Sequence, residues 1–297
     1  MKKLQLVLTS IAILLGCGGE GEPIRVGSKN FTESVILAEV VAQALERHGC
    51  DVERRANLGG TMVAHSAITS GSLDAYVEYS GTALTAILGE PASSDRAAVD
   101  RTIRDQYDRL GLVWGPNLGF NNTFAMIVRK SDAEAFRLET ISDLKKVERA
   151  FQPGFGPEFA ARPDGYDGLR QTYGLAFTNG PKTMDLGLTY RALAGGQVDL
   201  IAGNSTDGLI ESLGLVALKD DRGYFPPYDA AVVYRREIDS RCAGASDTIA
   251  ALAGTIDETE MRRMNFEVDG GKRSPAEVVR EFLATAGTAV AAGSVEE

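Results

Sequence analysis

The sequence predicts an α/β protein made of two lobes. Short apolar runs that fit β-strands alternate with amphipathic stretches that fit helices over residues 24–110, and the alternation resumes over residues 123–213. Strands that alternate with helices in this way are typical of α/β domains with a largely parallel sheet. The pattern breaks at Pro226 and Pro227, because proline fits neither the interior of a helix nor a central strand. We therefore expect two α/β lobes.

The first stretch is expected to begin with a strand and a long helix. A variant capping box formed by Asn30 and Glu33 starts that helix and Gly49 ends it, whereas Asp95 caps a later helix. The strands of this stretch are expected at residues 24–28, 51–57 and 73–78, and its helices at residues 30–49, 61–70, 82–88 and 96–110.

The second stretch follows the same pattern. Ser142 is expected to cap a helix, and Gly174 to end the helix at residues 166–173. The remaining elements are expected as strands at residues 123–129, 175–178, 198–202 and 230–234, and as helices at residues 185–194, 207–213, 246–252, 257–266 and 276–286. Pro275 stands at the first position of the last helix, where its missing N–H costs nothing.

Composition excludes several classes of function. The 297 residues include 41 Asp and Glu against 31 Lys and Arg, a net charge of −10, so no basic surface for nucleic acid is expected. With 44% hydrophobic and 24% charged residues, the chain is expected to fold rather than remain disordered. Three Cys and two His make a zinc cluster improbable, and we expect neither a metal nor an organic cofactor.

The N-terminus has the features of a secretory signal. A basic head at residues 1–3 precedes an apolar run at residues 4–15, which is too short to span a membrane. The run leads into Leu14-Leu15-Gly16-Cys17, which resembles a bacterial lipobox. We expect a signal peptide at residues 1–16, a lipid on Cys17 that anchors the protein to a membrane, and a tether at residues 17–23. An ordinary secretory signal followed by a chance cysteine is the alternative.

Two further cysteines, Cys50 and Cys242, remain in a chain that is expected to be exported. Export permits oxidation, so the two are candidates for a disulfide. Two unpaired, partly buried cysteines agree with the sequence nearly as well.

No catalytic motif is complete. Residues 203–207 lack the last glycine of a Gly-x-Ser-x-Gly elbow, and His48 and His65 have no convincing nucleophile as partner. Asp74 and Glu78 resemble a pair of glycosidase carboxylates only as far as any two acids do in a chain with 41 of them. We therefore expect a protein that is not an enzyme.

Five short segments, however, form a set along the chain. They are residues 27–33 (GSKNFTE), 74–84 (DAYVEYSGTAL), 162–165 (RPDG), 205–208 (STDG) and 225–228 (FPPY). In sequence and order they resemble the quaternary-amine substrate-binding proteins of ABC importers, the receptors for glycine betaine, choline and carnitine. The resemblance covers about residues 24–285.

The resemblance implies a two-lobed periplasmic-binding-protein fold of type II, with the ligand held between the lobes. Lobe I would comprise residues 24–122 and 227–297, and lobe II residues 123–226. The chain would cross the hinge near Asn121-Asn122 and again near Pro226-Pro227. Stiff prolines at a crossing would restrict the lobes to a closing motion.

In the family that the sequence resembles, basic and hydroxyl groups hold the carboxylate of the ligand. The resemblance assigns this role to Lys29, Thr82 and Arg162. Lys29 precedes a helix N-terminus, which itself favours anions. Taken singly, Lys29 and Arg162 also fit ordinary surface charges, and Thr82 also fits a helix cap.

A cage of aromatic faces holds the trimethylammonium group in that family. Tyr79 and Tyr228 stand at cage positions, Phe124 retains a ring without the hydroxyl, and Asn204 stands where a tyrosine is usual. Loss of one aromatic wall costs about 0.5–2 kcal/mol of cation binding. The resemblance also places Asn30, Asn122 and Thr206 at the ligand.

The implied function is capture of a small zwitterion outside the cytoplasm by a monomeric, lipid-anchored receptor and its delivery to an ABC permease. The changes at Phe124 and Asn204 leave open a less methylated ligand or another carboxylate. A sensor subunit on the same fold is a further alternative. A hydrolase that uses Asp74 or Glu78 is the third.

Overall fold

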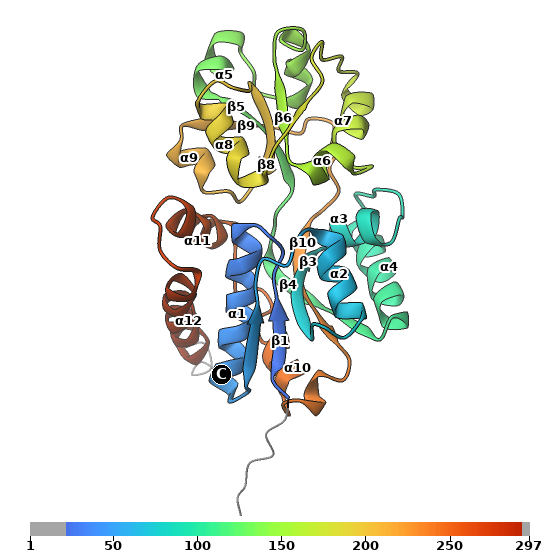
Figure 1. Cartoon of the computed structure of the whole chain (residues 1–297), viewed down its shortest axis with the longest axis vertical. Coiled ribbons are helices and arrows are strands. Elements are labelled where there is room, and N and C mark those ends of the chain that lie inside the picture. The colour runs from blue at the N-terminus through green and yellow to red at the C-terminus, as the bar shows by residue number, and fades with distance from the viewer. Residues whose placement is uncertain (1–21, 293–297) are drawn as a thin grey trace, which may run out of the picture.

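The computed structural model describes residues 22–292 and has two lobes, one above the other in Figure 1. Each lobe is built around a five-stranded sheet covered by helices. The signal peptide expected at residues 1–16, the lipidation expected at Cys17 and most of the expected tether fall outside the described residues. Within residues 22–292, no helix is long and apolar enough to cross a membrane.

Lobe I contains the first four strands and the last one. Its sheet has the order β2-β1-β3-β10-β4. The strands are β1 (Ile24–Gly27), β2 (Val52–Arg55), β3 (Ala75–Tyr79), β4 (Leu112–Asn121) and β10 (Asp229–Arg235). The helices are α1 (Thr32–His48), α2 (Thr61–Thr69), α3 (Ser80–Thr82), η1 (Ala83–Ile87), α4 (Arg96–Arg109), η3 (Ile238–Ser240), α10 (Ala245–Ala250), α11 (Glu258–Asp269) and α12 (Pro275–Ala292).

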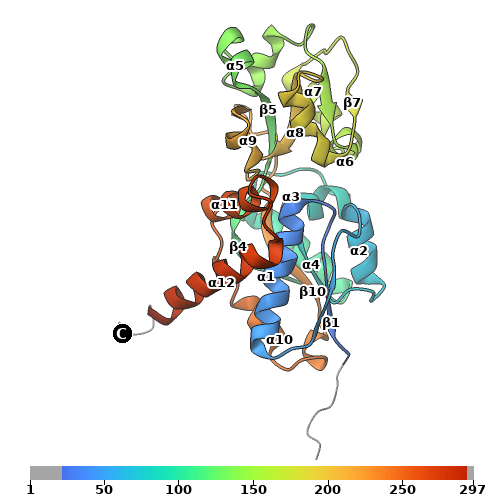
Figure 2. The same cartoon turned by 60° about the vertical axis from the view of Figure 1, so that its left-hand side comes forward.

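The sheet of lobe I has a hydrophobic layer on each face. Side chains alternate between the two faces of a strand, so Val77 of β3 packs with α1, α10 and α11, whereas Tyr76 packs on the other side with α2 and α4. Figure 2 shows α11 at the level where the two lobes meet, and α11 contacts α9 of lobe II.

Lobe II contains the middle of the chain. Its sheet has the order β7-β6-β8-β5-β9. The strands are β5 (Phe124–Arg129), β6 (Pro153–Phe155), β7 (Lys182–Thr183), β8 (Leu200–Asn204) and β9 (Leu215–Leu218). The helices are α5 (Lys130–Phe136), η2 (Ile141–Lys146), α6 (Pro157–Ala161), α7 (Tyr166–Tyr173), α8 (Leu186–Ala194) and α9 (Leu209–Ser212).

The chain passes between the lobes after β4 and again before β10. The two crossings lie side by side, because Asn121 Oδ1 accepts a hydrogen bond from Tyr228 N at 2.6 Å and Asn122 N donates to Tyr228 O at 3.0 Å. β4 leaves lobe I and β10 returns to it, so the two strands run in opposite directions where they pair.

The prediction of largely parallel sheets was wrong. β10 is antiparallel to both of its neighbours in lobe I, and β5 is antiparallel to both of its neighbours in lobe II. The parallel pairings are confined to β1, β2 and β3 in one sheet and to β6, β7 and β8 in the other. The hinge strands therefore impose the mixed topology.

Three local predictions also need correction. The capping box expected from Asn30 and Glu33 does not form, because α1 has Phe31 as its N-cap and no side chain caps it. Residues 175–178, expected as a strand, have no regular structure. Ser142 does not cap a helix; Thr140 does so for η2, in a capping box with Asp143. By contrast, Asp95 caps α4 and Gly174 ends α7 as expected.

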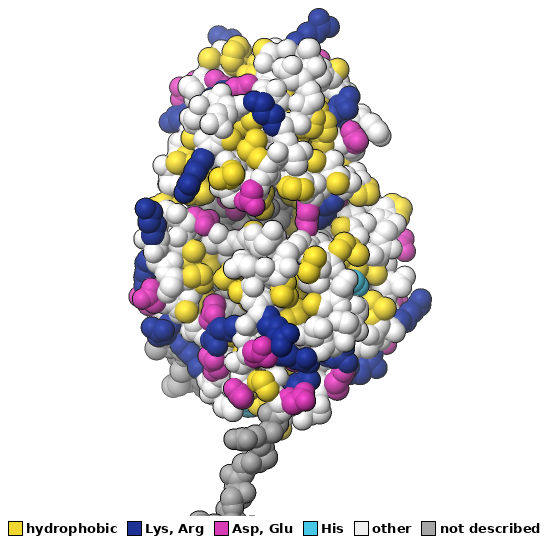
Figure 3. Space-filling model, in the orientation of Figure 1, with side chains coloured by type: hydrophobic (Ala, Val, Ile, Leu, Met, Phe, Trp, Pro, Cys, Tyr) yellow, Lys and Arg dark blue, Asp and Glu magenta, His cyan; other side chains and the backbone are white. Residues whose placement is uncertain are grey.

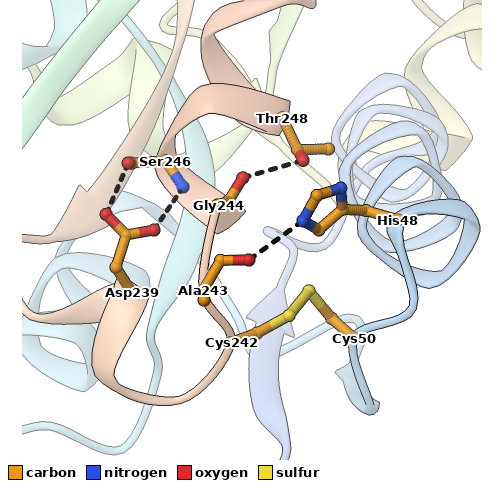
Figure 4. The surroundings of a disulfide bond; sticks show 8 residues. All are labelled: His48, Cys50, Asp239, Cys242, Ala243, Gly244, Ser246 and Thr248. Carbon is orange, nitrogen blue, oxygen red and sulfur yellow. Dashed lines mark hydrogen bonds between the residues drawn. A yellow bond between two sulfur atoms is a disulfide. The ribbon is translucent and has the colours of Figure 1, made fainter.

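A disulfide joins Cys50 to Cys242, which settles the pairing that the sequence left open. Figure 4 shows the bond beside His48, whose Nε2 lies 2.9 Å from Ala243 O. The bond connects the end of α1 to the segment before α10, across 192 residues of sequence. It therefore fastens the returning C-terminal part of lobe I to the N-terminal part.

Candidate functional site

The two lobes enclose a cavity of about 280 Å³ whose walls come from both lobes. This volume lies near the lower end of the range of about 300–1,000 Å³ for small-molecule sites, so the cavity suits a small ligand. Nine residues singled out from the sequence line it: Lys29, Asn30, Tyr79, Thr82, Asn122, Phe124, Arg162, Asn204 and Tyr228.

Lys29 is a buried cation that lines the cavity. It lies between β1 and α1, and its backbone N–H donates to Ser34 Oγ at 2.8 Å. Its ammonium group forms an ion pair with the buried Glu78 at 2.7 Å and lies 4.9 Å from the centre of the Tyr79 ring. The charge of Lys29 is therefore fixed in place and partly compensated.

Arg162 is the corresponding cation of lobe II and follows α6 directly. Its guanidinium binds Asp164 through two hydrogen bonds, of 2.8 and 2.6 Å, and it donates to Thr82 Oγ1 of lobe I at 3.2 Å. Such forked contacts are strong and directional. Arg162 consequently joins the lobes at the cavity.

Asp164 gathers donors from both lobes. Besides Arg162, it accepts hydrogen bonds from Tyr228 Oη at 2.5 Å and from Thr85 Oγ1 at 3.0 Å. Burial raises the pKa of Asp164, but the bonds from Arg162 and Tyr228 outweigh that effect and hold it below its ordinary value. The carboxylate is therefore ionised and pairs with Arg162.

The cavity has three aromatic walls at predicted cage positions. Tyr79 donates its hydroxyl to Glu33 Oε1 at 2.6 Å, and Tyr228 donates its hydroxyl to Asp164. Phe124 packs edge to face with Tyr228 at 5.5 Å between ring centres. Burial and the adjacent carboxylates raise the pKa of both tyrosines, so these residues offer neutral rings with a fixed orientation.

The fourth cage position is polar. Asn204 ends β8, its backbone N–H donates to Asp207 Oδ2 at 2.8 Å, and its Nδ2 lies 3.4 Å from Asp207 Oδ1. Thr206, two residues later, does not line the cavity; it is fully buried and donates to Glu33 Oε2 at 2.5 Å. The structure thus separates Thr206 from the residues that face the ligand space.

Sequence reasoning missed the acidic residues of the cavity wall. Glu158 of α6 accepts a hydrogen bond from Thr61 N, the first residue of α2 in the other lobe, at 2.8 Å. Helix α2 has Gly60 as its N-cap and no capping side chain of its own. A helix that starts after Gly59-Gly60 without a capping side chain is the signal that another residue must supply the acceptor.

The charges around the cavity sum to a negative value. The cavity is lined by two cations, Lys29 and Arg162, and by two acids, Glu158 and Asp185. The cations are also paired with Glu78 and Asp164. A net anion would therefore meet repulsion here, whereas a ligand that carries both charges can use the cations and the aromatic faces together.

The chemistry of the described residues does not favour catalysis. Asp74 is engaged by Arg25 at 2.8 Å and by Arg241 at 3.1 Å, away from the cavity, and Glu78 is engaged by Lys29. Among residues 22–292, no cluster of three or more His, Cys, Asp or Glu side chains could hold a metal ion. On the face shown in Figure 3, basic and acidic side chains are interspersed over both lobes.

Comparison with known proteins gives close relatives. The carnitine transport binding protein of Listeria monocytogenes is 35% identical over 288 residues, which cover 94% of this chain and 93% of the relative. The glycine-betaine-binding protein of Pseudomonas aeruginosa is 36% identical over 289 residues, 92% of this chain and 93% of the relative. A crystal structure titled as a glycine betaine/carnitine/choline ABC transporter matches with a TM-score of 0.74 at 32% identity, covering 88% of this chain and 98% of that one.

The family model for the substrate binding domain of the ABC-type glycine betaine transport system matches residues 22–285. The structural likeness agrees with the two-lobed periplasmic-binding-protein fold. Substrate-binding proteins of ABC importers act outside the cytoplasm and are not enzymes. This chain belongs to the family of substrate-binding domains of ABC-type glycine betaine transport systems.

Proposed function

We propose that this protein captures a compact zwitterion of the glycine betaine type, with a carboxylate and a quaternary ammonium group, and delivers it to a membrane permease. One observation carries the proposal: cationic side chains and aromatic faces meet within a single small cavity between the lobes. The guanidinium of Arg162 lies 5.4 Å from the centre of the Phe124 ring, and the ammonium of Lys29 lies 4.9 Å from that of Tyr79.

The anionic end of the ligand is assigned to Lys29, Thr82 and Arg162. All three line the cavity, and together they offer an ammonium, a hydroxyl and a planar guanidinium. Because each cation already has a carboxylate partner, the ligand carboxylate adds to an existing ion pair. This arrangement favours a zwitterion over a simple anion.

The cationic end is assigned to the faces of Tyr79, Phe124 and Tyr228. A desolvated cation gains up to about 2 kcal/mol from a good aromatic face. Since the carboxylate-binding and aromatic groups adjoin, the two charges of the ligand should be separated by only a few bonds.

Delivery and anchoring are inferred from the family and from the lipobox-like segment at residues 14–17. A lipid on Cys17 would keep a monomeric receptor close to its permease on the outer side of the membrane. The glycine-rich composition of residues 17–23 supports this arrangement, because linkers of that composition leave an attached domain free to reorient.

Thermal unfolding with a ligand panel tests the proposal. The chain from residue 18 onward would be heated with glycine betaine, proline betaine, carnitine, choline and unmethylated amino acids. A ligand at 100 times its dissociation constant adds about 2.7 kcal/mol of stability, which raises the melting temperature by several degrees. We expect shifts with methylated zwitterions; a response confined to other carboxylates would overturn the assignment.

A second ligand class is favoured by Asn204. Its amide group occupies a wall where an aromatic face would hold methyl groups, and its Nδ2 is only weakly bound to Asp207 at 3.4 Å. An amide can bond an N–H that a fully methylated nitrogen lacks. Tighter binding of dimethylglycine than of glycine betaine would support this second class.

A further inference from the structure

Glu33 is a buried carboxylate directly behind the cavity wall. It lies in the first turn of α1, is 1% exposed and does not line the cavity. It nevertheless accepts four hydrogen bonds, from Tyr79 Oη at 2.6 Å, Asn122 Nδ2 at 2.6 Å, Thr206 Oγ1 at 2.5 Å and Asn265 Nδ2 at 2.8 Å. These donors come from β3, the hinge, lobe II and α11.

The four donors divide between the two carboxylate oxygens. Oε1 accepts only from Tyr79 and Asn122, both of which line the cavity. Oε2 accepts only from Thr206 and Asn265, neither of which lines the cavity. One oxygen therefore contacts the ligand wall and the other contacts the junction of the lobes.

The Oε2 side is where lobe II meets lobe I behind the hinge. Asn265 of α11 donates to Thr206 O at 3.0 Å as well as to Glu33, so the loop after β8 is bound by α11 and α1 together. Thr206 is the only one of the four donors in lobe II. If the lobes separate, the buried carboxylate loses this donor.

We propose that Glu33 is a positioning residue that couples the cavity wall at Tyr79 and Asn122 to closure of the lobes through Thr206. A carboxylate is a rigid planar group, so displacement of the donors on one oxygen displaces the other oxygen. Closure supplies the fourth donor, and a ligand that holds Tyr79 and Asn122 in place keeps the carboxylate aligned to receive it. The ligand half of this coupling rests on the proposed function.

Lobe closure can be measured without any ligand. Probes on introduced cysteines at the exposed Arg101 of α4 and Ala135 of α5 would report the distance between the lobes. Thr206→Val removes the lobe II donor and keeps the shape of the side chain, and Glu33→Gln replaces the acceptor. We expect both to shift the distances toward more open lobes.

Thr189→Val is the matched control. Thr189 is also a fully buried threonine of lobe II, but its hydroxyl bonds only to Leu186 O of its own helix. It should leave the lobe distances unchanged. Unchanged distances in Thr206→Val would overturn the proposal, even if Glu33→Gln proved too unstable to measure.

Ligand binding tests the coupling itself. Tyr79→Phe and Thr206→Val should each weaken binding of the panel ligand about 3- to 10-fold. If the two sites are coupled, the loss of affinity in the double variant should be smaller than the product of the two single losses, by a factor of about three or more. In a Glu33→Gln background the two effects should multiply. If the two losses of affinity multiply in the background that retains Glu33, the coupling is refuted. If no panel ligand binds the wild type, the proposed function fails while the lobe distances still decide the role of Glu33.

Discussion

Arg162 shows how one side chain serves two roles. It is almost completely buried, it is bound to Asp164 within its own lobe, and it reaches Thr82 in the other.

The sequence alone identified Arg162, because its charge stands in a segment that resembles the family. It did not identify Glu158, whose role arises only when the lobes come together. Thr206 was expected at the ligand because its segment matches the family; in the structure its hydroxyl donates to Glu33, and the residue does not line the cavity.

Arg162→Ala should weaken ligand binding by about 100-fold or more. The change removes charge-assisted bonds and leaves Asp164 buried without its cation, and each such loss costs about 1.5–3 kcal/mol. Titration calorimetry with a panel ligand measures the effect. Arg170→Ala, which removes a half-buried arginine that pairs with Asp167 and does not line the cavity, is the control and should bind as the wild type does.

Asp207 should make stability depend on pH. Burial raises the pKa of its carboxyl from 3.8 to about 6, although Tyr190 and Asn204 donate hydrogen bonds to it and oppose the rise. Glu33, a second negative group nearby, adds to the rise. Between pH of about 4 and 6 the folded protein therefore holds a proton that the unfolded chain has lost, so stability falls as pH increases through this window.

Urea unfolding of the wild type and of Asp207→Asn at several pH values tests this dependence. The difference in the free energy of unfolding, wild type minus variant, should fall by about 1–3 kcal/mol between pH 4 and 7. A difference that stays constant over this range would show that Asp207 titrates at its ordinary value.

At the scale of elements, the hinge strands β5 and β10 and some helix ends were predictable, whereas the hinge strand β4 was not. Asp95 and Gly174 act locally, so their patterns identify the start of α4 and the end of α7. β4 was missed because Gly115, Pro116 and Gly119 argue against a strand. Gly119 has a φ of +124° and lies so close to Ile256 O that a Cβ would approach within 2.5 Å. Only the packed C-terminal segment explains that glycine.

The N-terminus of α2 should respond to loss of Glu158 from the opposite lobe. The carboxylate completes the first turn of α2, where negative charge is favourable by about 0.3–1 kcal/mol. Glu158→Gln should therefore weaken every panel ligand about two- to fivefold, and Glu158→Ala should weaken them further. Glu134→Gln, on the exposed side of α5, provides a control in calorimetry. Wild-type affinity in Glu158→Ala would contradict this role.

At the scale of the molecule, the disulfide and the cavity serve separate purposes. Cys50–Cys242 lies within lobe I, and neither cysteine lines the cavity. A disulfide that closes a long loop typically stabilises a protein by about 2–4 kcal/mol. The sequence identified the two cysteines but not their pairing, because spacing of 192 residues carries no information on distance in the fold.

Replacing both cysteines by serine should lower the melting temperature by several degrees and leave ligand affinity within twofold of the wild type. Calorimetric scanning and titration on the same samples separate the two quantities. A large loss of affinity with an unchanged melting temperature would show that the disulfide supports ligand binding rather than stability.

The position of β10 in the middle of the lobe I sheet governs the order in which the molecule can be assembled. Lobe II is formed by one uninterrupted stretch of chain, so its sheet can be completed as soon as β9 is available. The sheet of lobe I remains divided between β3 and β4 until β10 has been made and inserted. Contacts between segments so distant in sequence form slowly. During export the C-terminal segment crosses the membrane last, and this is the segment that completes lobe I.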